Sequence, residues 1–320
     1  MLEERNNQGL LESMIWTGVG VSALVVLLRV WLLPAAADWQ TGLFTSNYWV
    51  IGLMVVALIA LVALRYFAGP VRREIVGTSA VSVGLVSLLS GAAMVIFGML
   101  DLLTLYGILP DNALTQRLGG EDSLTIMSAI EYGFCLLGGL ALLRFGLALL
   151  TEGATRRGIA QWTILAPVLW AWFRLVNYEM SYASMVRIED NFFGFVMLIV
   201  ELLFLFRLAR YASGIGRVSA GSLLAHAMAT VMFAISGPLT RVIMYLLNDN
   251  VAYAAYQLAG PLYVVVGVLA LVVGIAILNG EEVGQSDSLA DVLDRDAAEA
   301  SVVASSDLVL DNATEVEESE

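Results

Sequence analysis

The 320-residue sequence contains no lysine, one cysteine (Cys135) and one histidine (His226). Without lysine, the chain cannot form a retinal or pyridoxal Schiff base, and it lacks the lysine of a Walker-type phosphate loop. One cysteine allows no disulfide within the chain, and one histidine cannot supply bis-histidine haem ligation or an HExxH zinc site. The sequence therefore predicts no cofactor and no metal site.

Charged residues are also scarce. They make up 14% of the chain, against 59% hydrophobic residues, whereas soluble domains are about a quarter charged and about half apolar. This balance predicts a membrane protein. The formal net charge of -13 arises near the C-terminus, because residues 281–320 hold 13 acids and one arginine, whereas residues 1–280 hold 16 acids and 15 arginines.

Residues 280–320 form a segment rich in acid, serine and alanine, with no aromatic residue. Such a segment cannot bury enough apolar surface to offset the entropy lost on ordering. It is predicted to be a disordered acidic tail that keeps the protein soluble. The alternative is a docking peptide, residues 281–320, for a basic cytosolic partner.

Apolar runs long enough to cross a bilayer recur about eight times. A spanning helix needs roughly 20 apolar residues, and barrel strands are about half as long, so helices are expected. The predicted spans are 14–34, 48–67, 79–103, 124–150, 159–178, 192–208, 222–247 and 252–278. The predicted fold class is all-α: a polytopic membrane helix bundle, residues 14–279, after an N-terminal segment, residues 1–13.

Arginine placement predicts the orientation of the bundle. Eight arginines fall at the connections after the even-numbered spans, and two fall after the odd-numbered spans. The eight are Arg65, Arg72, Arg73, Arg156, Arg157, Arg207, Arg210 and Arg217, and the two are Arg117 and Arg187. Because positively charged connections stay in the cytoplasm, both termini are predicted to be cytoplasmic. No organellar signal is visible, so the predicted location is a prokaryotic plasma membrane.

The stretch WFRLVNYEMSY, residues 172–182, places charge inside an apolar span. Arg174, Asn177, Tyr178 and Ser181 recur at i, i+3, i+4 and i+7, so they share one helical face. Counted from a span that starts at residue 159, Arg174 lies about 20 Å along the helix axis. This places it in the outer third of the membrane.

Other polar residues fall at a similar predicted depth. Arg29 and Arg241 lie on two other outward-running spans, and Arg241 shares its face with Asn248. Asp101 ends a face of the third span that forms a small-residue packing seam. The residues of this seam are Gly84, Ser87, Gly91 and Gly98. Glu131 lies on a narrow polar face of the fourth span with Ser128, Cys135 and Gly138.

Isolated charges inside a membrane cost several kcal/mol, so these three arginines and two acids are expected to face one another. The interpretation is a charged outer vestibule that binds a small anionic or zwitterionic ligand. The alternative is that the arginines snorkel to the lipid phosphates or form structural ion pairs.

Glu201 lies about ten residues into its span, roughly 15 Å along the axis and near the bilayer midplane. A side chain cannot snorkel from there, so the carboxyl must be protonated, hydrogen-bonded or paired. This makes Glu201 a candidate proton-coupling group. The alternative is a neutral glutamate that bridges two helices. Three prolines, Pro167, Pro238 and Pro261, are predicted to interrupt their spans, as prolines do near transporter sites.

The function predicted best is a small-molecule permease or transporter-like protein. The alternatives are a membrane sensor or accessory subunit that acts through the acidic tail, and a structural scaffold. Catalysis is not expected, because Ser236 and the lone His226 lie on different faces of one helix at separate depths. The lipid bilayer is an expected partner, and nucleic acid is not.

Overall fold

The computed structural model describes residues 2–38, 43–44, 48–69, 73–108, 125–152, 163–182, 188–213, 218–247 and 260–282. The chain divides into two units, Met1–Glu281 and Glu282–Glu320. All eight helices belong to the first unit. The predicted acidic tail, after its first residues, lies outside the described residues.

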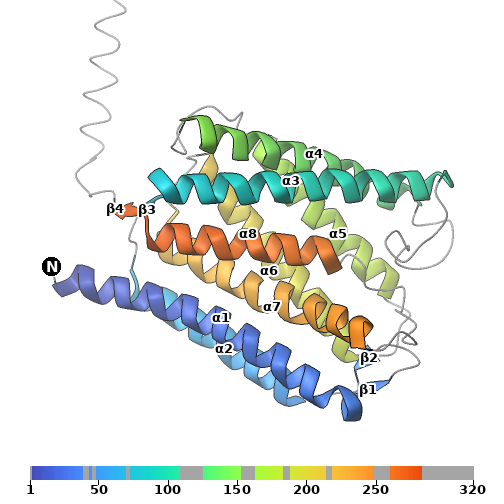
Figure 1. The fold of residues 1–320 in the computed structure, drawn as a ribbon, viewed down its shortest axis with the longest axis horizontal. Helices are drawn as coiled ribbons and strands as arrows, with labels where there is room; N and C mark the ends of the chain where they lie inside the picture. The colour runs from blue at the N-terminus through green and yellow to red at the C-terminus, as the bar shows by residue number, and fades with distance from the viewer. Residues whose placement is uncertain are drawn as a thin grey trace, which may run out of the picture. The chain divides into compact units, whose positions relative to one another are not determined.

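Eight α-helices make up most of the described chain (Figure 1). They are α1 (Leu2–Ala36), α2 (Tyr48–Phe67), α3 (Gly77–Leu105), α4 (Thr125–Glu152), α5 (Ala166–Tyr182), α6 (Ile188–Ala212), α7 (Ala220–Leu247) and α8 (Gly260–Leu278). Each helix overlaps one predicted span, and α2 has the predicted bounds. The all-α prediction is therefore confirmed.

Within the described residues, five helices are long and apolar enough to cross a membrane. These stretches are Asn7–Trp31, Trp49–Phe67, Gly77–Leu105, Ile126–Thr151 and Ala220–Thr240. In α8 the apolar stretch, Leu262–Leu278, is shorter, and α6 carries three charged residues in its second half, Glu201, Arg207 and Arg210. The five apolar helices are consistent with a membrane protein.

Two of the three predicted helix interruptions are helix starts. Pro167 and Pro261 each occupy the second position of a helix, α5 and α8. Proline suits the first turn, because its missing N–H would have no partner there and its fixed φ favours the helix. Pro238 does lie inside its helix, α7. A 3-10 turn, Thr163–Leu165, precedes α5.

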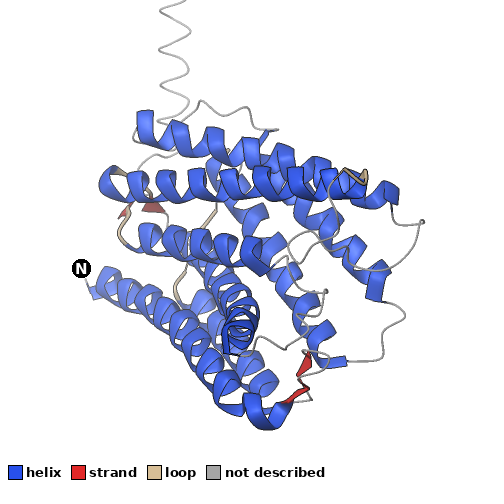
Figure 2. Cartoon of the chain, turned by 45° about the vertical axis from the view of Figure 1, so that its right-hand side comes forward, coloured by secondary structure: helices blue, strands red, loops and turns tan. Residues whose placement is uncertain are grey.

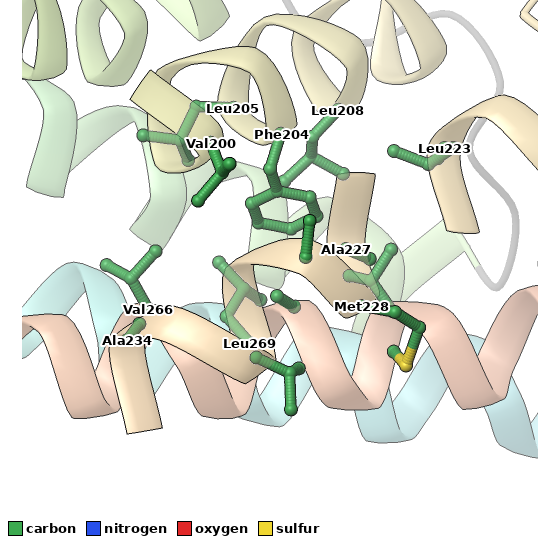
Figure 3. Close-up of a cluster of buried hydrophobic side chains, with 14 of the residues drawn as sticks. Val200, Phe204, Leu205, Leu208, Leu223, Ala227, Met228, Ala234, Val266 and Leu269 are labelled. Atoms are coloured by element: carbon green, nitrogen blue, oxygen red, sulfur yellow. The ribbon is translucent and has the colours of Figure 1, made fainter. Parts of the chain in front are cut away.

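α7 is the central helix of the unit. In its apolar stretch 83% of the residues are buried, compared with 22% for α2. α7 packs against α1, α2, α6 and α8, and many of its buried residues are alanine, glycine or serine, which let neighbouring backbones approach. Figure 3 shows the apolar packing between α6, α7 and α8 around Phe204, Met228 and Leu269, all of them fully buried.

Glycines allow α3 and α4 to pack in close contact, side by side in Figure 1. A Cβ atom on Gly91 would lie 2.6 Å from the carbonyl oxygen of Gly139, and one on Gly139 would lie 2.7 Å from that of Gly91. Two turns away, a Cβ on Gly146 would lie 2.6 Å from the carbonyl oxygen of Gly84. The predicted small-residue seam of α3 is confirmed, and a row of glycines on α4 faces it.

Four short strands accompany the helices (Figure 2). β1 (Ala37–Asp38) pairs antiparallel with β2 (Leu43–Phe44), with Ala37 opposite Phe44. β3 (Arg73–Glu74) belongs to a second two-stranded sheet with β4 (Glu281–Glu282). These strands are too short to define the fold.

Hydrogen bonds tie the connection before α3 to the ends of α6 and α8. Arg73 Nη1 donates to the carbonyl oxygen of Leu278, the last residue of α8. The Tyr211 hydroxyl accepts the N–H of Ile75 at 2.9 Å and donates to the carbonyl oxygen of Arg73 at 3.3 Å. We call this set the α6–α8 clasp. It joins the helix that carries Glu201 to the residues just before the acidic tail.

Candidate functional site

Arg174 of α5 and Glu131 of α4 form a buried ion pair. Arg174 Nη1 lies 2.6 Å from Glu131 Oε1, and the two side chains are 11% and 2% exposed. A charge-assisted hydrogen bond of this length is roughly twice as strong as a neutral one. The arginine is therefore paired inside the bundle and does not snorkel to a surface.

Two further side chains complete the network around this pair. Asn177 Nδ2 donates to Glu131 Oε2 at 2.6 Å, and Arg174 Nε donates to the Tyr263 hydroxyl oxygen of α8 at 2.9 Å. Asn177 Nδ2 also lies 3.4 Å from Ser128 Oγ. Both oxygens of Glu131 thus accept a hydrogen bond, which a buried carboxylate requires. We call Glu131, Arg174, Asn177 and Tyr263 the charged network.

Local sequence explains why α4 and α5 meet with these faces. Arg174 and Asn177 are three residues apart on α5, so their side chains are neighbours on one helical face. Gly138 permits the close approach, because a Cβ there would lie 3.1 Å from Pro167 Cα. Beside the ion pair, the rings of Phe134 and Phe173 stack at 5.2 Å with an interplanar angle of 8°.

Asp101 and Glu201 lie within electrostatic reach of the charged network. Arg174 and Glu131 both act on the half-buried Asp101 carboxyl, and Arg174 acts on Glu201. Tyr263 is also within electrostatic reach of Glu201. Among these three carboxyl groups, Glu131 contacts the Arg174 guanidinium directly, and Asp101 and Glu201 act on it only through their charge.

Glu201 is fully buried, in the middle of α6. Neither of its carboxyl oxygens has a hydrogen-bond partner within the described residues. Next to it, Thr230 Oγ1 of α7 donates to the carbonyl oxygen of Val200 at 3.1 Å and fastens the two helices together. The bridging alternative, in which Glu201 itself hydrogen-bonds two helices, is not seen in this part of the chain.

Arg29 has a different environment from Arg174. Its guanidinium carbon lies 4.2 Å from the centroid of the Phe193 ring in α6, a cation–π contact, and the residue is 2% exposed. Phe193 in turn packs on Phe233 of α7, with ring centroids 5.2 Å apart. Arg29 is thus buried against an aromatic ring, a contact that the sequence interpretation did not include.

The start of α5 differs from the predicted start of the fifth span, and the depth of Arg174 in a membrane stays a prediction. Because α5 begins at Ala166 and not at residue 159, Arg174 is the middle residue of a 17-residue helix. Its Cα lies about 12 Å from the start of the helix axis. The cause is Pro167, which sets the start of the helix in the middle of a continuous apolar run.

Two predicted site residues, Arg241 and Asn248, lie partly or wholly outside the described residues. The backbone of Arg241 belongs to α7, but its side chain is outside the described residues, and Asn248 lies wholly outside them. The predicted face that joins Arg241 with Asn248 therefore stays a prediction.

Tyr263 is the network member that sequence reasoning missed. It lies in a stretch, Leu262–Leu278, that is otherwise apolar, so no polar face drew attention to it. A buried tyrosine usually finds a partner for its hydroxyl, and this is the signal that could have identified it.

No group of three or more His, Cys, Asp or Glu side chains within the described ranges is arranged to hold a metal ion. Comparison with protein-family models, with curated proteins and with solved structures finds no match to this chain. The evidence for its function therefore comes from its own residues.

Proposed function

We propose that the chain is a proton-coupled permease for a small zwitterionic or anionic solute, and not an enzyme. The observation that carries the proposal is Glu201, a carboxyl buried in mid-helix with no hydrogen-bond partner in the described residues, within reach of Arg174. An ionisable residue in this setting is costly to maintain, and such residues commonly mark ion or substrate pathways.

We propose that all eight helices cross a prokaryotic plasma membrane, with both termini in the cytoplasm. The eight helices correspond to the eight apolar runs, and arginines concentrate at the connections after even-numbered spans. The arginines of α6 near its C-terminal end, Arg207 and Arg210, fit the cytoplasmic interface of such a span.

The charged network would be the closed barrier of the permease. The Glu131 carboxylate is fully engaged, whereas Arg174 Nη2 makes no hydrogen bond within the described residues. A solute carboxylate would compete with Glu131 for the guanidinium, and a solute ammonium would pair with the carboxyl that is released. A carboxyl group paired with the arginine, with Asp101 and Glu201 within electrostatic reach, favours a zwitterion over a simple anion.

The coupling proton would bind Glu201. A protonated carboxyl avoids the cost of an isolated buried charge, so Glu201 would release its proton when its surroundings gain water or a solute cation. The solute and the proton would thus use neighbouring positions, because Glu201 lies within electrostatic reach of both Arg174 and Tyr263.

The test uses purified protein in liposomes that contain a pH-sensitive dye, challenged with amino acids, betaines, monocarboxylates and inorganic phosphate. We expect at least one solute to carry protons inward. Glu201→Gln should reduce this proton entry to background, yet the same solute should still stabilise the variant against heat. The matched control is Glu179→Gln, an exposed position on α5, which should transport like the wild type.

Proton entry at the wild-type rate in Glu201→Gln would remove Glu201 from the mechanism. If the folded wild-type protein moves protons with none of these solutes, the permease proposal fails.

A second candidate is a membrane sensor that signals through the acidic tail. The α6–α8 clasp favours it, because Arg73 and Tyr211 link the last residue of α8 to the helix that carries Glu201. The two candidates differ in one comparison. Deletion of residues 283–320 should leave liposome transport unchanged in a permease, whereas in a sensor it should abolish the cellular response and leave the bundle folded.

A further inference from the structure

Three arginines gather at one end of the helical unit, away from the charged network. Arg65 lies in the last turn of α2 and Arg210 in the last turn of α6. Arg207 lies one turn before Arg210 on the same face of α6. The charges of Arg65 and Arg210 both act on Arg207, and those of Arg65 and Arg207 both act on His226 of α7. α2 and α6 both pack against α7, and Ala68, the residue after α2, lies at the start of α7, where a Cβ on Gly221 would be 3.5 Å from the Cβ of Ala68.

These arginines repel one another without an acidic partner. None of the three makes an ion pair with an acidic side chain in the described parts of the chain, and all three are partly buried. Three like charges held close together and partly removed from water favour the binding of an anion. Arg207 and Arg210 can each present a planar fork of N–H donors to phosphate oxygens.

Exposed apolar side chains lie next to the arginines on both α2 and α6. On α6, Leu203 and Phe206 are 42% and 41% exposed, and they share a face with Arg207 and Arg210. On α2 the exposed stripe runs through Val55, Ile59, Val62 and Tyr66 and ends beside Arg65. A hydrocarbon chain could lie against either stripe, with its polar end at the three guanidinium groups.

We propose that Arg65, Arg207 and Arg210 bind the phosphate of an anionic membrane lipid, whose acyl chains lie along Leu203 and Phe206 of α6 and along the exposed stripe of α2. A free phosphate would satisfy the arginines but would leave both apolar stripes unused. Basic pockets between membrane helices on the cytoplasmic side suit anionic lipid headgroups. Tyr66, beside Arg65 at the helix end, is the kind of residue that lies at headgroup level.

The experiment measures thermal unfolding of the full-length protein in detergent by tryptophan fluorescence. The additives are phosphatidylglycerol, phosphatidylcholine and inorganic phosphate. We expect phosphatidylglycerol at about 100 times its Kd to raise the Tm of the wild type by about 5 °C. Phosphatidylcholine and inorganic phosphate should each have little effect, because one lacks net charge and the other lacks acyl chains.

The test variant is Arg207→Gln with Arg210→Gln, which should lose the phosphatidylglycerol shift. The matched control is Arg144→Gln, at an exposed arginine of α4, which should keep it. If the double variant does not fold, Arg65→Gln alone provides the same comparison, and native mass spectrometry counts the lipids that stay bound.

A full shift in the Arg207→Gln and Arg210→Gln variant would overturn the assignment. An equal shift with inorganic phosphate would show a soluble-anion site in place of a lipid site, and an equal shift with phosphatidylcholine would show that the arginines are not involved. The result is independent of transport, so it can fail or succeed without affecting the permease proposal.

Discussion

Glu131→Gln should be among the most destabilising single substitutions in the chain. The change leaves the Arg174 guanidinium buried without its counter-ion, and removal of one partner of a buried ion pair costs about 3–5 kcal/mol. Asn177 would also lose a charged acceptor for its amide. The measurement is the free energy of unfolding in mixed micelles, followed by tryptophan fluorescence.

Two controls make this prediction specific. Glu179→Gln removes an exposed acid from α5 and should change the free energy of unfolding by less than about 0.5 kcal/mol. Glu131→Gln combined with Arg174→Gln removes both charges and should recover most of the loss, because paired amides can hydrogen-bond without a buried charge. Wild-type stability in the single variant would show that the ion pair contributes nothing to the fold.

Gly91→Ala should have a comparable effect on the packing of α3 against α4. The added Cβ would lie 2.6 Å from the Gly139 carbonyl oxygen and 2.7 Å from the Leu143 nitrogen. Both atoms belong to the backbone, so no side-chain rotation relieves the clash and the helices must separate. We expect a loss of about 3 kcal/mol, at the upper end of the range for overpacked interiors.

Gly133→Ala is the matched control for the seam. Nothing lies within 4 Å of a Cβ built at Gly133, which is also a helical glycine of α4. Alanine favours a helix over glycine by about 1 kcal/mol, so this variant should be as stable as the wild type or slightly more stable. Equal losses at Gly91 and Gly133 would mean that close packing at the seam does not explain the loss at Gly91.

The sequence predicted the helices, and the errors in their predicted bounds have physical causes. The range 48–67 matched α2 because polar or turn-forming residues flank the apolar run on both sides. The range 159–178 was shifted, because hydropathy alone does not reveal that Pro167 starts the helix. The expected distance of Arg174 from the start of its helix was therefore too long.

The site was predictable in part for a related reason. Periodicity placed Arg174 with Asn177 on one face, and Glu131 on the polar face of α4, and these faces do meet. Which helices are neighbours depends on tertiary packing, so periodicity could not show that Arg29 stacks on Phe193. It also could not show that Tyr263 of α8 reaches the guanidinium, because a single tyrosine forms no pattern.

The most direct test of the central claim, that the charged network is part of a transport pathway, is solute-driven proton entry in liposomes by the Glu131→Gln and Arg174→Gln double variant. This variant should fold, because both buried charges are removed together. The permease account predicts that it unfolds near the wild-type temperature but transports at background level. Transport at the wild-type rate by this folded variant would contradict the account and would make the charged network purely structural.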